Sequence, residues 1–366
     1  MIRRNTSEEA RKITFEITTM TPLPVGEQVF ISGNAEGLGD WNPSGLPLAR
    51  EDDFVWSASI VLPAGRTVEY KITRGSWDTE ECRVDGAIPE NYELSTGRDR
   101  TVKHQVHQWK DHRMSPSRIA GDYRVHDRVS SLCLRYNRRV IIWLPPSYEQ
   151  EPDRRYPVVY MHDGQQVFDP ATSTWNQDWE VDEWCTKLID EDRLQEIIVV
   201  GIYSTDDRFV EYNPSQMGPE YTRFVVEELK PWIDREYRTL SGRDHTVVAG
   251  ASLGGSISFY MAWTHPEVFC GAACLSPAFR FNDDQFMLDA VREADSVPDL
   301  KIYLYGGQGD ELEQQLIAGM REMAALLKGK GMKKDRLLVV EDPRAEHNEA
   351  AWARHTDHWL LYFFGK

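Results

Sequence analysis

Cysteine is sparse in this sequence and never occurs in a metal-binding or redox spacing. There is no C-x-x-C pair among the five cysteines, which are Cys82, Cys133, Cys185, Cys270 and Cys274. An odd, sparse set of this kind excludes a disulfide framework and a cysteine zinc site, and it predicts reduced thiols that are mostly buried.

Long hydrophobic runs and clusters of positive charge are also missing. No apolar stretch approaches the roughly 18 residues that a membrane helix needs, so no membrane partner is expected. Lys and Arg number 42 against 59 Asp and Glu, a formal net charge of -17. The basic residues occur only as isolated pairs, so the acidic surface would repel a phosphate backbone and no nucleic-acid partner is expected. The N-terminus lacks the apolar core of a signal peptide, which predicts a cytoplasmic protein, or a secreted one whose leader has been removed.

The hydrophobic pattern changes near residue 120, which predicts two domains. Before that point, short β-forming runs without a helical period are separated by turn residues, at 13–18, 28–32, 54–62 and 68–73. This spacing predicts an all-β immunoglobulin-like sandwich over residues 1–105. Residues 106–120 are polar and predict a linker.

Beyond residue 120, continuous apolar runs alternate with amphipathic helical stretches. The apolar runs lie at 140–144, 158–161, 197–202, 246–249, 271–275, 301–305 and 337–340. Buried strands separated by helices predict a mostly parallel sheet with helices on both faces, an α/β fold, over residues 121–366.

The segment Gly250-Ala-Ser-Leu-Gly254 carries the strongest chemical signal. A predicted strand feeds into it and a helical run leaves it, so Ser252 is expected on a sharp strand-to-helix turn at the carboxyl end of the sheet. The glycines are needed because a side chain there would collide with the neighbouring strand and helix. The pattern predicts a catalytic nucleophile; the alternative is a Gly/Ser turn with an unreactive hydroxyl.

A nucleophilic serine needs a base and a carboxylate that orients it, and in this architecture they follow in the chain order Ser, Asp/Glu, His. His347 follows the last predicted strand and precedes the last predicted helix, where the base is expected. Asp310 follows the strand at 301–305 and is the predicted acid, with Glu311 and Glu313 as rivals. Its alternative role is to cap the helix that follows.

Two backbone N–H groups are expected to form an oxyanion hole. One belongs to Leu253, the residue after the nucleophile, and the other to Gln165, in a glycine turn that ends an early buried strand. Candidate walls of the substrate pocket follow strand ends on the same edge and are Trp175, Trp179, Arg208 and Tyr212. This chemistry requires no metal and no organic cofactor.

These residues resemble the esterase branch of the α/β-hydrolases, which includes enterochelin-type, feruloyl and acetylxylan esterases, S-formylglutathione hydrolase and the mycolyltransferases. The resemblance is carried by four ordered segments, Ile142-Trp-Leu-Pro-Pro-Ser-Tyr148, Tyr156-Pro-Val-Val-Tyr-Met-His-Asp-Gly164, Gly250-Ala-Ser-Leu-Gly-Gly255 and His347-Asn-Glu-Ala-Ala-Trp352. It implies Ser252 as nucleophile, His347 as base and Gln165 as an oxyanion donor. It implies Asp310 as acid, although some members use Glu.

Residues 10–105 resemble a starch-binding carbohydrate-binding module. The matching segments are Val29-Phe-Ile-Ser-Gly33, Leu38-Gly-Asp-Trp41, Leu62-Pro-Ala-Gly65 and Val68-Glu-Tyr-Lys-Ile72. The resemblance implies that Trp41 stacks on a glucose ring and that Lys71 hydrogen-bonds sugar hydroxyls. The second stacking tryptophan of that family has no certain match, and Trp77 is the nearest. An α-glucan or other carbohydrate is therefore the expected partner; the alternative is a sandwich that only packs on the esterase or shapes its cleft.

The combined pattern predicts a serine carboxylic ester hydrolase that cleaves a small acyl or aromatic ester, linked to a carbohydrate, through an acyl-enzyme. One alternative is an enterochelin-like siderophore esterase, whose anionic substrate would need a cationic pocket in which Arg208 is the visible candidate. A second is an acyltransferase. An alternative from another class is a catalytically inactive hydrolase fold that serves as a carbohydrate-binding or scaffold protein.

Overall fold

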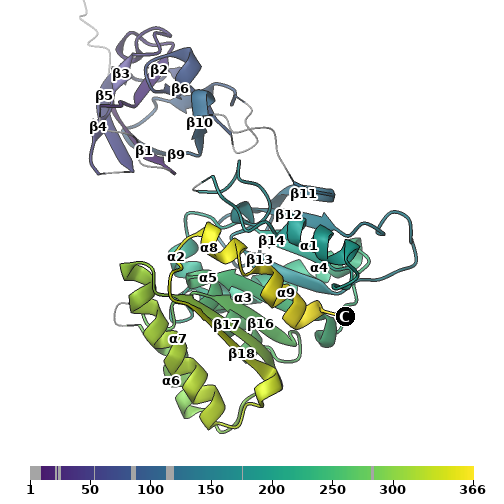
Figure 1. Cartoon of the computed structure of the whole chain (residues 1–366). Helices are drawn as coiled ribbons and strands as arrows, with labels where there is room; N and C mark the ends of the chain where they lie inside the picture. The colour runs from purple at the N-terminus through teal and green to yellow at the C-terminus, as the bar shows by residue number, and fades with distance from the viewer. Residues whose placement is uncertain are drawn as a thin grey trace, which may run out of the picture. The chain divides into compact units, whose positions relative to one another are not determined.

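The computed structural model describes residues 10–20, 23, 26–52, 54–83, 88–112, 119–174, 176–281 and 284–366. The chain divides into two compact units, residues 1–117 with 170–176 and residues 118–169 with 177–366 (Figure 1). None of the helices in the described residues combines the length and hydrophobicity that crossing a bilayer requires.

The first unit is an all-β sandwich. Its strands are β1 (Ala10–Thr19), β2 (Phe30–Gly33), β3 (Leu46–Pro47), β4 (Ala49–Arg50), β5 (Val55–Pro63), β6 (Thr67–Thr73), β7 (Glu81–Cys82), β8 (Tyr92–Ser95), β9 (Arg100–Val106) and β10 (Gln108–Trp109). One four-stranded sheet has the order β4-β5-β1-β9 and the other the order β3-β2-β6-β8, while β10 pairs with β7. This architecture confirms the predicted immunoglobulin-like sandwich.

Alternating burial explains why these segments are strands. In β1, Ile13, Phe15 and Ile17 are fully buried and the residues between them are not, which is the period-two pattern of a strand with one face on a core. The predicted linker at 106–120 contains ordered structure at its start, because β10 lies within it. Residues 113–118 of that linker lie outside the described residues.

The second unit is built on one eight-stranded sheet with the order β11-β12-β14-β13-β15-β16-β17-β18 (Figure 1). Its strands are β11 (Asp122–Val129), β12 (Arg138–Leu144), β13 (Val158–His162), β14 (Ile198–Ile202), β15 (Thr246–Ala251), β16 (Gly271–Leu275), β17 (Lys301–Gly307) and β18 (Leu337–Asp342). The pairs β11–β12 and β12–β14 are antiparallel. The pairs from β14 to β18 are parallel.

Helices cover both faces of this sheet. They are α1 (Val181–Asp190), α2 (Arg208–Glu211), α3 (Gly218–Arg223), the π-helical turn η5 (Phe224–Leu229), α4 (Lys230–Glu236), α5 (Leu253–Thr264), α6 (Phe286–Glu293), α7 (Glu311–Gly329), α8 (Glu349–Ala353) and α9 (Thr356–Phe364). Successive residues of β13 contribute to different cores. Val158 and Tyr160 pack in the core that includes α3 to α7, whereas Val159 and Met161 pack in the core that includes α1 and α9. The predicted parallel sheet with two covered faces is confirmed.

The parallel strands also decide where a site can form. The carboxyl ends of β13, β15, β16, β17 and β18 lie at one edge of the sheet, because these strands run in the same direction. Ligands of open α/β sheets bind outside this edge.

Candidate active site

Ser252 occupies a strained turn between β15 and α5. Its backbone has φ 56° and ψ −126°, a region that a residue with a side chain adopts only under constraint. The constraint is visible, because its N–H donates to the carbonyl of Leu275 at 2.9 Å and its carbonyl accepts from the N–H of Ala278 at 3.2 Å. A Cβ on Gly250 would lie 2.6 Å from the carbonyl carbon of Gly254, so the turn admits no side chain there. The predicted strand–turn–helix geometry is present.

His347 lies in the loop after β18 and is held by a buried carboxylate. Its Nδ1 lies 2.9 Å from Oε1 of Glu313, a fully buried residue in the first turn of α7. The second carboxylate oxygen of Glu313 accepts from the N–H of Gly307 at 2.8 Å, at the end of β17. Because an ionised carboxylate only accepts hydrogen bonds, this contact favours a proton on Nδ1 and leaves Nε2 of the neutral ring as an acceptor.

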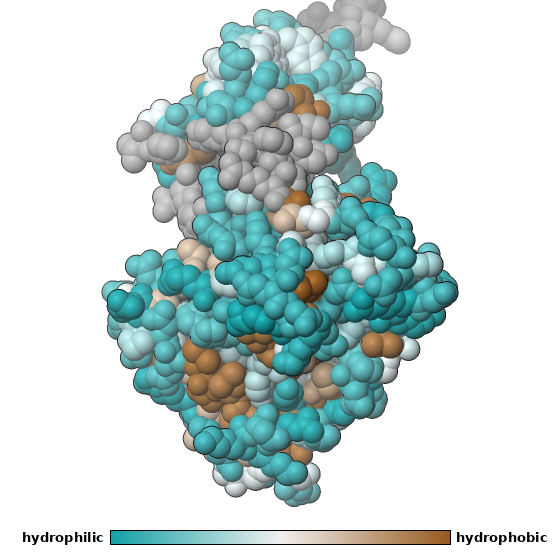
Figure 2. Space-filling view, turned by 45° about the vertical axis from the view of Figure 1, so that its right-hand side comes forward, coloured by the Kyte–Doolittle hydropathy of each residue, from teal (hydrophilic) through white to brown (hydrophobic). Residues whose placement is uncertain are grey.

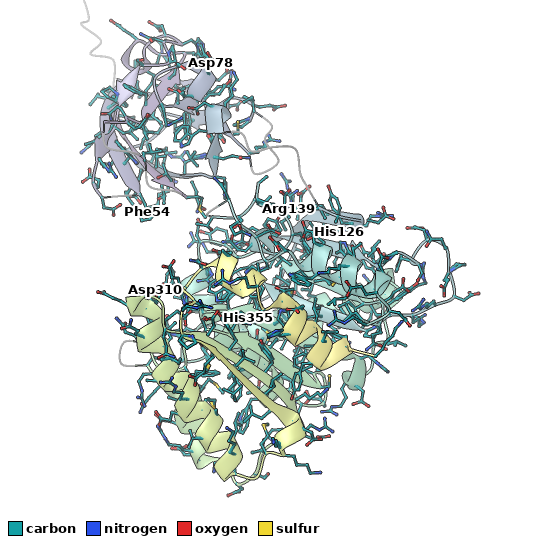
Figure 3. All side chains as sticks on the ribbon, viewed as in Figure 1. Phe54, Asp78, His126, Arg139, Asp310 and His355 are labelled. Atoms are coloured by element: carbon teal, nitrogen blue, oxygen red, sulfur yellow. The ribbon has the colours of Figure 1, made fainter. Side chains whose placement is uncertain are left out.

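The structure corrects the pairing that was expected for Asp310. Its Oδ1 accepts from the N–H of Glu313 at 2.8 Å, which caps α7, and its Oδ2 accepts from the backbone N–H of His347 at 2.7 Å. Burial alone would raise the pKa of Asp310, but these backbone donors hold that pKa below its ordinary value. Asp310 thus binds the backbone of His347, and Glu313 binds the ring. Figure 3 shows Asp310 at the N-terminal end of α7. Glu311, the other rival, is exposed.

Trp352 links the histidine to the strand end beside the serine. Its ring lies edge-on to the imidazole, with 5.1 Å between ring centroids, and its Nε1 donates to Oγ of Ser276 at 3.0 Å. Ser276 directly follows β16, the neighbour of β15. Trp179, a predicted pocket wall, packs at 5.5 Å against Trp352 and is almost fully buried, so it supports the site from behind. Trp175 lies outside the described residues.

The two expected oxyanion donors come from neighbouring turns. Gln165 lies in the short 3-10 turn η4 (Gly164–Gln166) that follows β13, and Ser204 holds its side chain at both ends, with 2.6 Å from Nε2 to Oγ and 3.1 Å from the Ser204 N–H to Oε1. Leu253 is the first residue of α5. A Cβ on Gly254 would lie 3.4 Å from Oδ2 of Asp163, the residue that precedes η4. The turn that carries Gln165 therefore lies against the first turn of α5.

A cavity of about 320 Å³ opens beside this elbow. Its lining residues are mainly apolar or aromatic and comprise Phe209, Val210, Tyr212, Asn213, Pro214, Gln216, Leu253, Ser256, Ala278, Phe279, Phe281, Asp284, Phe286 and Met287. The set includes Tyr212, a predicted pocket wall. Figure 2 shows a face of the second unit on which hydrophobic residues gather among hydrophilic ones.

Arg208, the remaining predicted pocket wall, forms an ion pair with a carboxylate of the protein. Its Nε and Nη2 lie 2.7 and 2.8 Å from Oδ1 and Oδ2 of Asp163. Burial alone would raise the pKa of Asp163, but the guanidinium holds that pKa below its ordinary value. This cation is therefore already neutralised within the protein.

The sandwich brings its three predicted sugar-binding residues together. Trp41, Lys71 and Trp77 line one hollow of about 340 Å³, together with Glu80 and Asn91. Both tryptophans are partly exposed, and Trp41 has a left-handed backbone with φ 66°. The Lys71 ammonium donates to the carbonyl of Pro89 at 2.9 Å and lies 3.4 Å from a carboxylate oxygen of Glu80. Sequence reasoning did not single out Glu80 or Asn91.

One group of carboxylates in the described part of the chain has the spacing of cation ligands. Asp178, Asp182 and Glu183 place ligand atoms within 4.8 Å of one another. Burial raises the pKa of Asp178 to about 7, and burial also raises that of Asp182. Asp178 and Asp182 can therefore lose their charge by each binding a proton, and they need no bound cation to do so.

The strand order, the strained serine after β15, and the carboxylate–histidine pair after β17 and β18 together define an α/β-hydrolase. Comparison with family models gives the narrower assignment. Residues 131–358 match the family described as Putative esterase, and the chain belongs to this family, a class of carboxylic ester hydrolases. Residues 10–109 match the starch binding domain.

Individual relatives agree with this division. An alpha-amylase from Niallia circulans is 36% identical over 104 residues, which are 28% of this chain and only 8% of the amylase. The structure of a ferulic acid esterase has a TM-score of 0.55 and 22% identity, over 66% of this chain and 98% of that chain. An enterobactin esterase from Shigella flexneri has a TM-score of 0.53 and 17% identity, over 98% of this chain and 95% of that chain. At these identities the two structural matches show the fold.

Proposed function

We propose that this chain is a serine esterase that removes an apolar or aromatic acyl group from a carbohydrate-linked ester. The observation that carries the proposal is the Glu313–His347 pair at the same sheet edge as the strained Ser252. A buried carboxylate that orients a histidine, beside a serine on a sharp turn, is the arrangement by which hydrolases activate a hydroxyl.

The proposed reaction proceeds in two steps through an acyl-enzyme. Nε2 of His347 takes the proton of Ser252 Oγ as Oγ attacks the ester carbonyl, and the N–H groups of Leu253 and Gln165 stabilise the oxyanion. His347 then protonates the leaving alkoxide, and the carbonyl re-forms as an ester of Ser252. Water then attacks this ester and gives one proton to His347. As the intermediate collapses to the carboxylic acid, His347 returns that proton to Oγ of Ser252, which regenerates the free serine and the neutral imidazole.

Glu313 is the proposed acid of this triad, in place of Asp310. Its buried carboxylate stabilises the imidazolium that forms when His347 takes a proton, and it keeps the ring in one orientation. Asp310 acts one step further away, by holding the backbones of Glu313 and His347.

The cavity beside Leu253 is the observation that favours a large, uncharged acyl group. Four phenylalanines and Met287 line it, and the flat faces of aromatic side chains suit an aromatic or branched acyl group. The catecholate of a siderophore is anionic and needs a free cation. Arg208 is neutralised by Asp163, which favours a neutral acyl group over a siderophore ester.

The alcohol part of the substrate is proposed to be carbohydrate. The support comes from the sandwich, whose family match is a starch binding domain and whose two tryptophans line one open hollow. A tryptophan face stacks on the C–H groups of a sugar ring without needing charge, which suits a neutral α-glucan and an acidic protein.

Labelling with a fluorophosphonate probe, followed by a panel of acetyl, butyryl, feruloyl and catecholate esters, tests the proposal. We expect labelling of the wild type and none of Ser252→Ala, with feruloyl or butyryl esters turned over faster than catecholate esters. An unlabelled, inactive wild type would indicate an inactive hydrolase fold that serves as a scaffold. Acyl transfer to a sugar in preference to water would indicate an acyltransferase.

A cavity variant sharpens the substrate assignment. Val210→Phe narrows the cavity and should lower kcat/KM for a feruloyl ester by about 10–100-fold while sparing an acetyl ester. Leu132→Phe introduces the same side chain at a solvent-exposed position of the same unit and serves as the control. Equal losses on both esters would place the acyl group elsewhere.

A further inference from the structure

Asp163 lies between the two proposed oxyanion donors. It has a left-handed backbone with φ 56° and is followed directly by the turn that carries Gln165. On its other side, its Oδ2 would be 3.4 Å from a Cβ on Gly254, in the first turn of α5 next to Leu253. Whatever holds Asp163 therefore also holds the turn that carries Gln165 against the first turn of α5.

Arg208 and Tyr212 hold Asp163 from one short segment. Arg208 gives a two-pronged ion pair, with one N–H on each carboxylate oxygen, and the Tyr212 hydroxyl accepts from the Asp163 backbone N–H at 3.1 Å. The guanidinium carbon lies 5.1 Å from the centroid of the Tyr212 ring, so the two residues also brace each other. A planar guanidinium that binds both carboxylate oxygens sets orientation as well as distance, which a lysine ammonium does not do.

The same segment forms a wall of the acyl cavity. Phe209, Val210, Tyr212 and Asn213 line it, and Arg208 begins α2 immediately before them. A single short segment, residues 208–213, therefore lines the cavity proposed for the acyl group and also holds the turn that carries Gln165.

We propose that Arg208 is a positioning residue, which acts through Asp163 to hold the N–H of Gln165 in the oxyanion hole and joins that hole to the wall of the acyl cavity. It does not touch the reacting atoms. The inference rests on the proposed serine esterase function. It adds a residue that holds an oxyanion donor at the position where the oxyanion forms. A donor displaced by about 1 Å loses about 10²-fold in rate, because the oxyanion forms only in the transition state.

The test compares three forms of this ion pair in the full-length chain. Arg208→Lys keeps the charge and loses the planar fork. Arg208→Ala leaves the buried Asp163 carboxylate without its partner, which can also impair folding. The double variant Arg208→Met with Asp163→Asn removes both charges and avoids this penalty, so that its loss of activity reports on positioning. We expect kcat for a feruloyl or butyryl ester to fall about 10-fold in Arg208→Lys and about 10²-fold in the other two, with KM within about threefold of wild type.

An inhibitor that mimics the transition state adds a readout that a merely structural role would not move. An aryl boronic acid forms a tetrahedral adduct with Ser252 whose oxygen occupies the oxyanion hole. Its inhibition constant should rise in proportion to the loss of kcat/KM across the three variants. Arg321→Lys is the matched control, because Arg321 forms the same two-pronged pair with Glu341, at 2.9 and 2.6 Å, away from the elbow. It should leave all these constants unchanged.

The Ser252→Ala variant separates the two ways to fail. If Ser252→Ala is inactive while the folded Arg208 variants keep kcat within twofold, the positioning role is wrong and the esterase mechanism stands. If the Arg208 variants change KM but not kcat, Arg208 contacts substrate and the positioning role is again wrong. If Ser252→Ala is as active as the wild type, the proposed function itself fails.

Discussion

The two units of the chain present their candidate functional residues in opposite ways. In the sandwich, Trp41, Trp77 and Lys71 are partly exposed and line an open hollow. In the hydrolase unit, Glu313 is fully buried, and backbone hydrogen bonds hold the residues around it. The first arrangement offers a surface for contact, and the second holds a few atoms in fixed relative positions.

The difference follows from what each site has to do. Binding a polymer of repeating sugars requires apolar area, and small errors in angle cost little. Acyl transfer requires atoms placed within tenths of an ångström, since each effect counts only when it acts on the transition state. Substitutions of the proposed catalytic residues in the hydrolase unit should therefore change activity much more than substitutions in the sandwich do.

The largest expected effect is at the nucleophile and base. Ser252→Ala and His347→Ala should each lower kcat by about 10⁴–10⁶, and the double variant should lose little more, because the residues act as a unit. Steady-state hydrolysis of a soluble ester measures this. If Ser252→Ala kept a tenth of wild-type activity, the mechanism proposed here would be wrong.

The next effect ranks the three carboxylates at the start of α7. Glu313→Gln should cost up to about 10⁴ in kcat, because the amide no longer favours the productive orientation of the imidazole. Asp310→Asn should cost about 10-fold, since one of its two backbone contacts can persist. Glu311→Gln, at an exposed position, is the control and should change nothing. The opposite ranking of Asp310 and Glu313 would return the acid role to Asp310.

A smaller effect is expected in the sandwich. Trp41→Ala should weaken binding to insoluble starch by about 1–3 kcal/mol, the range for losing one buried aromatic contact, and Trp77→Ala should do the same. Turnover of a small soluble ester should not change. Wild-type protein that ignores starch, glycogen and cyclodextrin would show that the hollow does not bind these glucans. Loss of ester turnover in a folded Trp41→Ala variant would make the sandwich a wall of the active site.

The smallest effect concerns pH and folding. Burial raises the pKa of Asp178 to about 7. The folded state therefore binds this proton more tightly than the unfolded state does, and the stability of the hydrolase unit should fall as pH rises from about 4 through 7. Asp178→Asn should remove part of this fall and raise the Tm at pH 8 by roughly 5 °C. Glu191→Gln, at an exposed position after α1, is the control, and an unchanged slope in Asp178→Asn would assign the fall to other groups.

Sequence reasoning predicted the two folds because their patterns are long and periodic. It missed β11, whose edge strand carries Asp122, Arg124 and Asp127 and is not continuously apolar. It also missed the two-residue strands of the sandwich, such as β7, which are too short to show a period. Such segments become strands because they pair with a neighbouring strand, as β11 does with β12 and β7 does with β10. The residues of one strand alone do not reveal this pairing.

The sequence predicted those site residues whose position between a strand and a helix identifies them. It left open those that differ only by their position in the first turn of a helix. Ser252 and His347 belong to the first kind, because each lies between one strand and the following helix. Asp310, Glu311 and Glu313 all follow β17, and only the start of α7 determines which carboxylate turns back toward the histidine. An available signal was the spacing Asp310-x-x-Glu313, which is typical of a capping residue followed by a helical carboxylate.

The two backbone contacts of Asp310 hold Glu313 and His347 together independently of the residues between them. Asp310 binds main-chain N–H groups at Glu313 and His347, so these contacts do not depend on the side chains between them. The 33 intervening residues, 314–346, form most of α7 and all of β18, and their length and surface can change provided that β18 returns the chain to Asp310. An insertion in the turn after α7, far along the chain from both anchor points, should therefore leave the pair intact. We therefore expect this turn to accept new loops or a fused domain without loss of ester turnover.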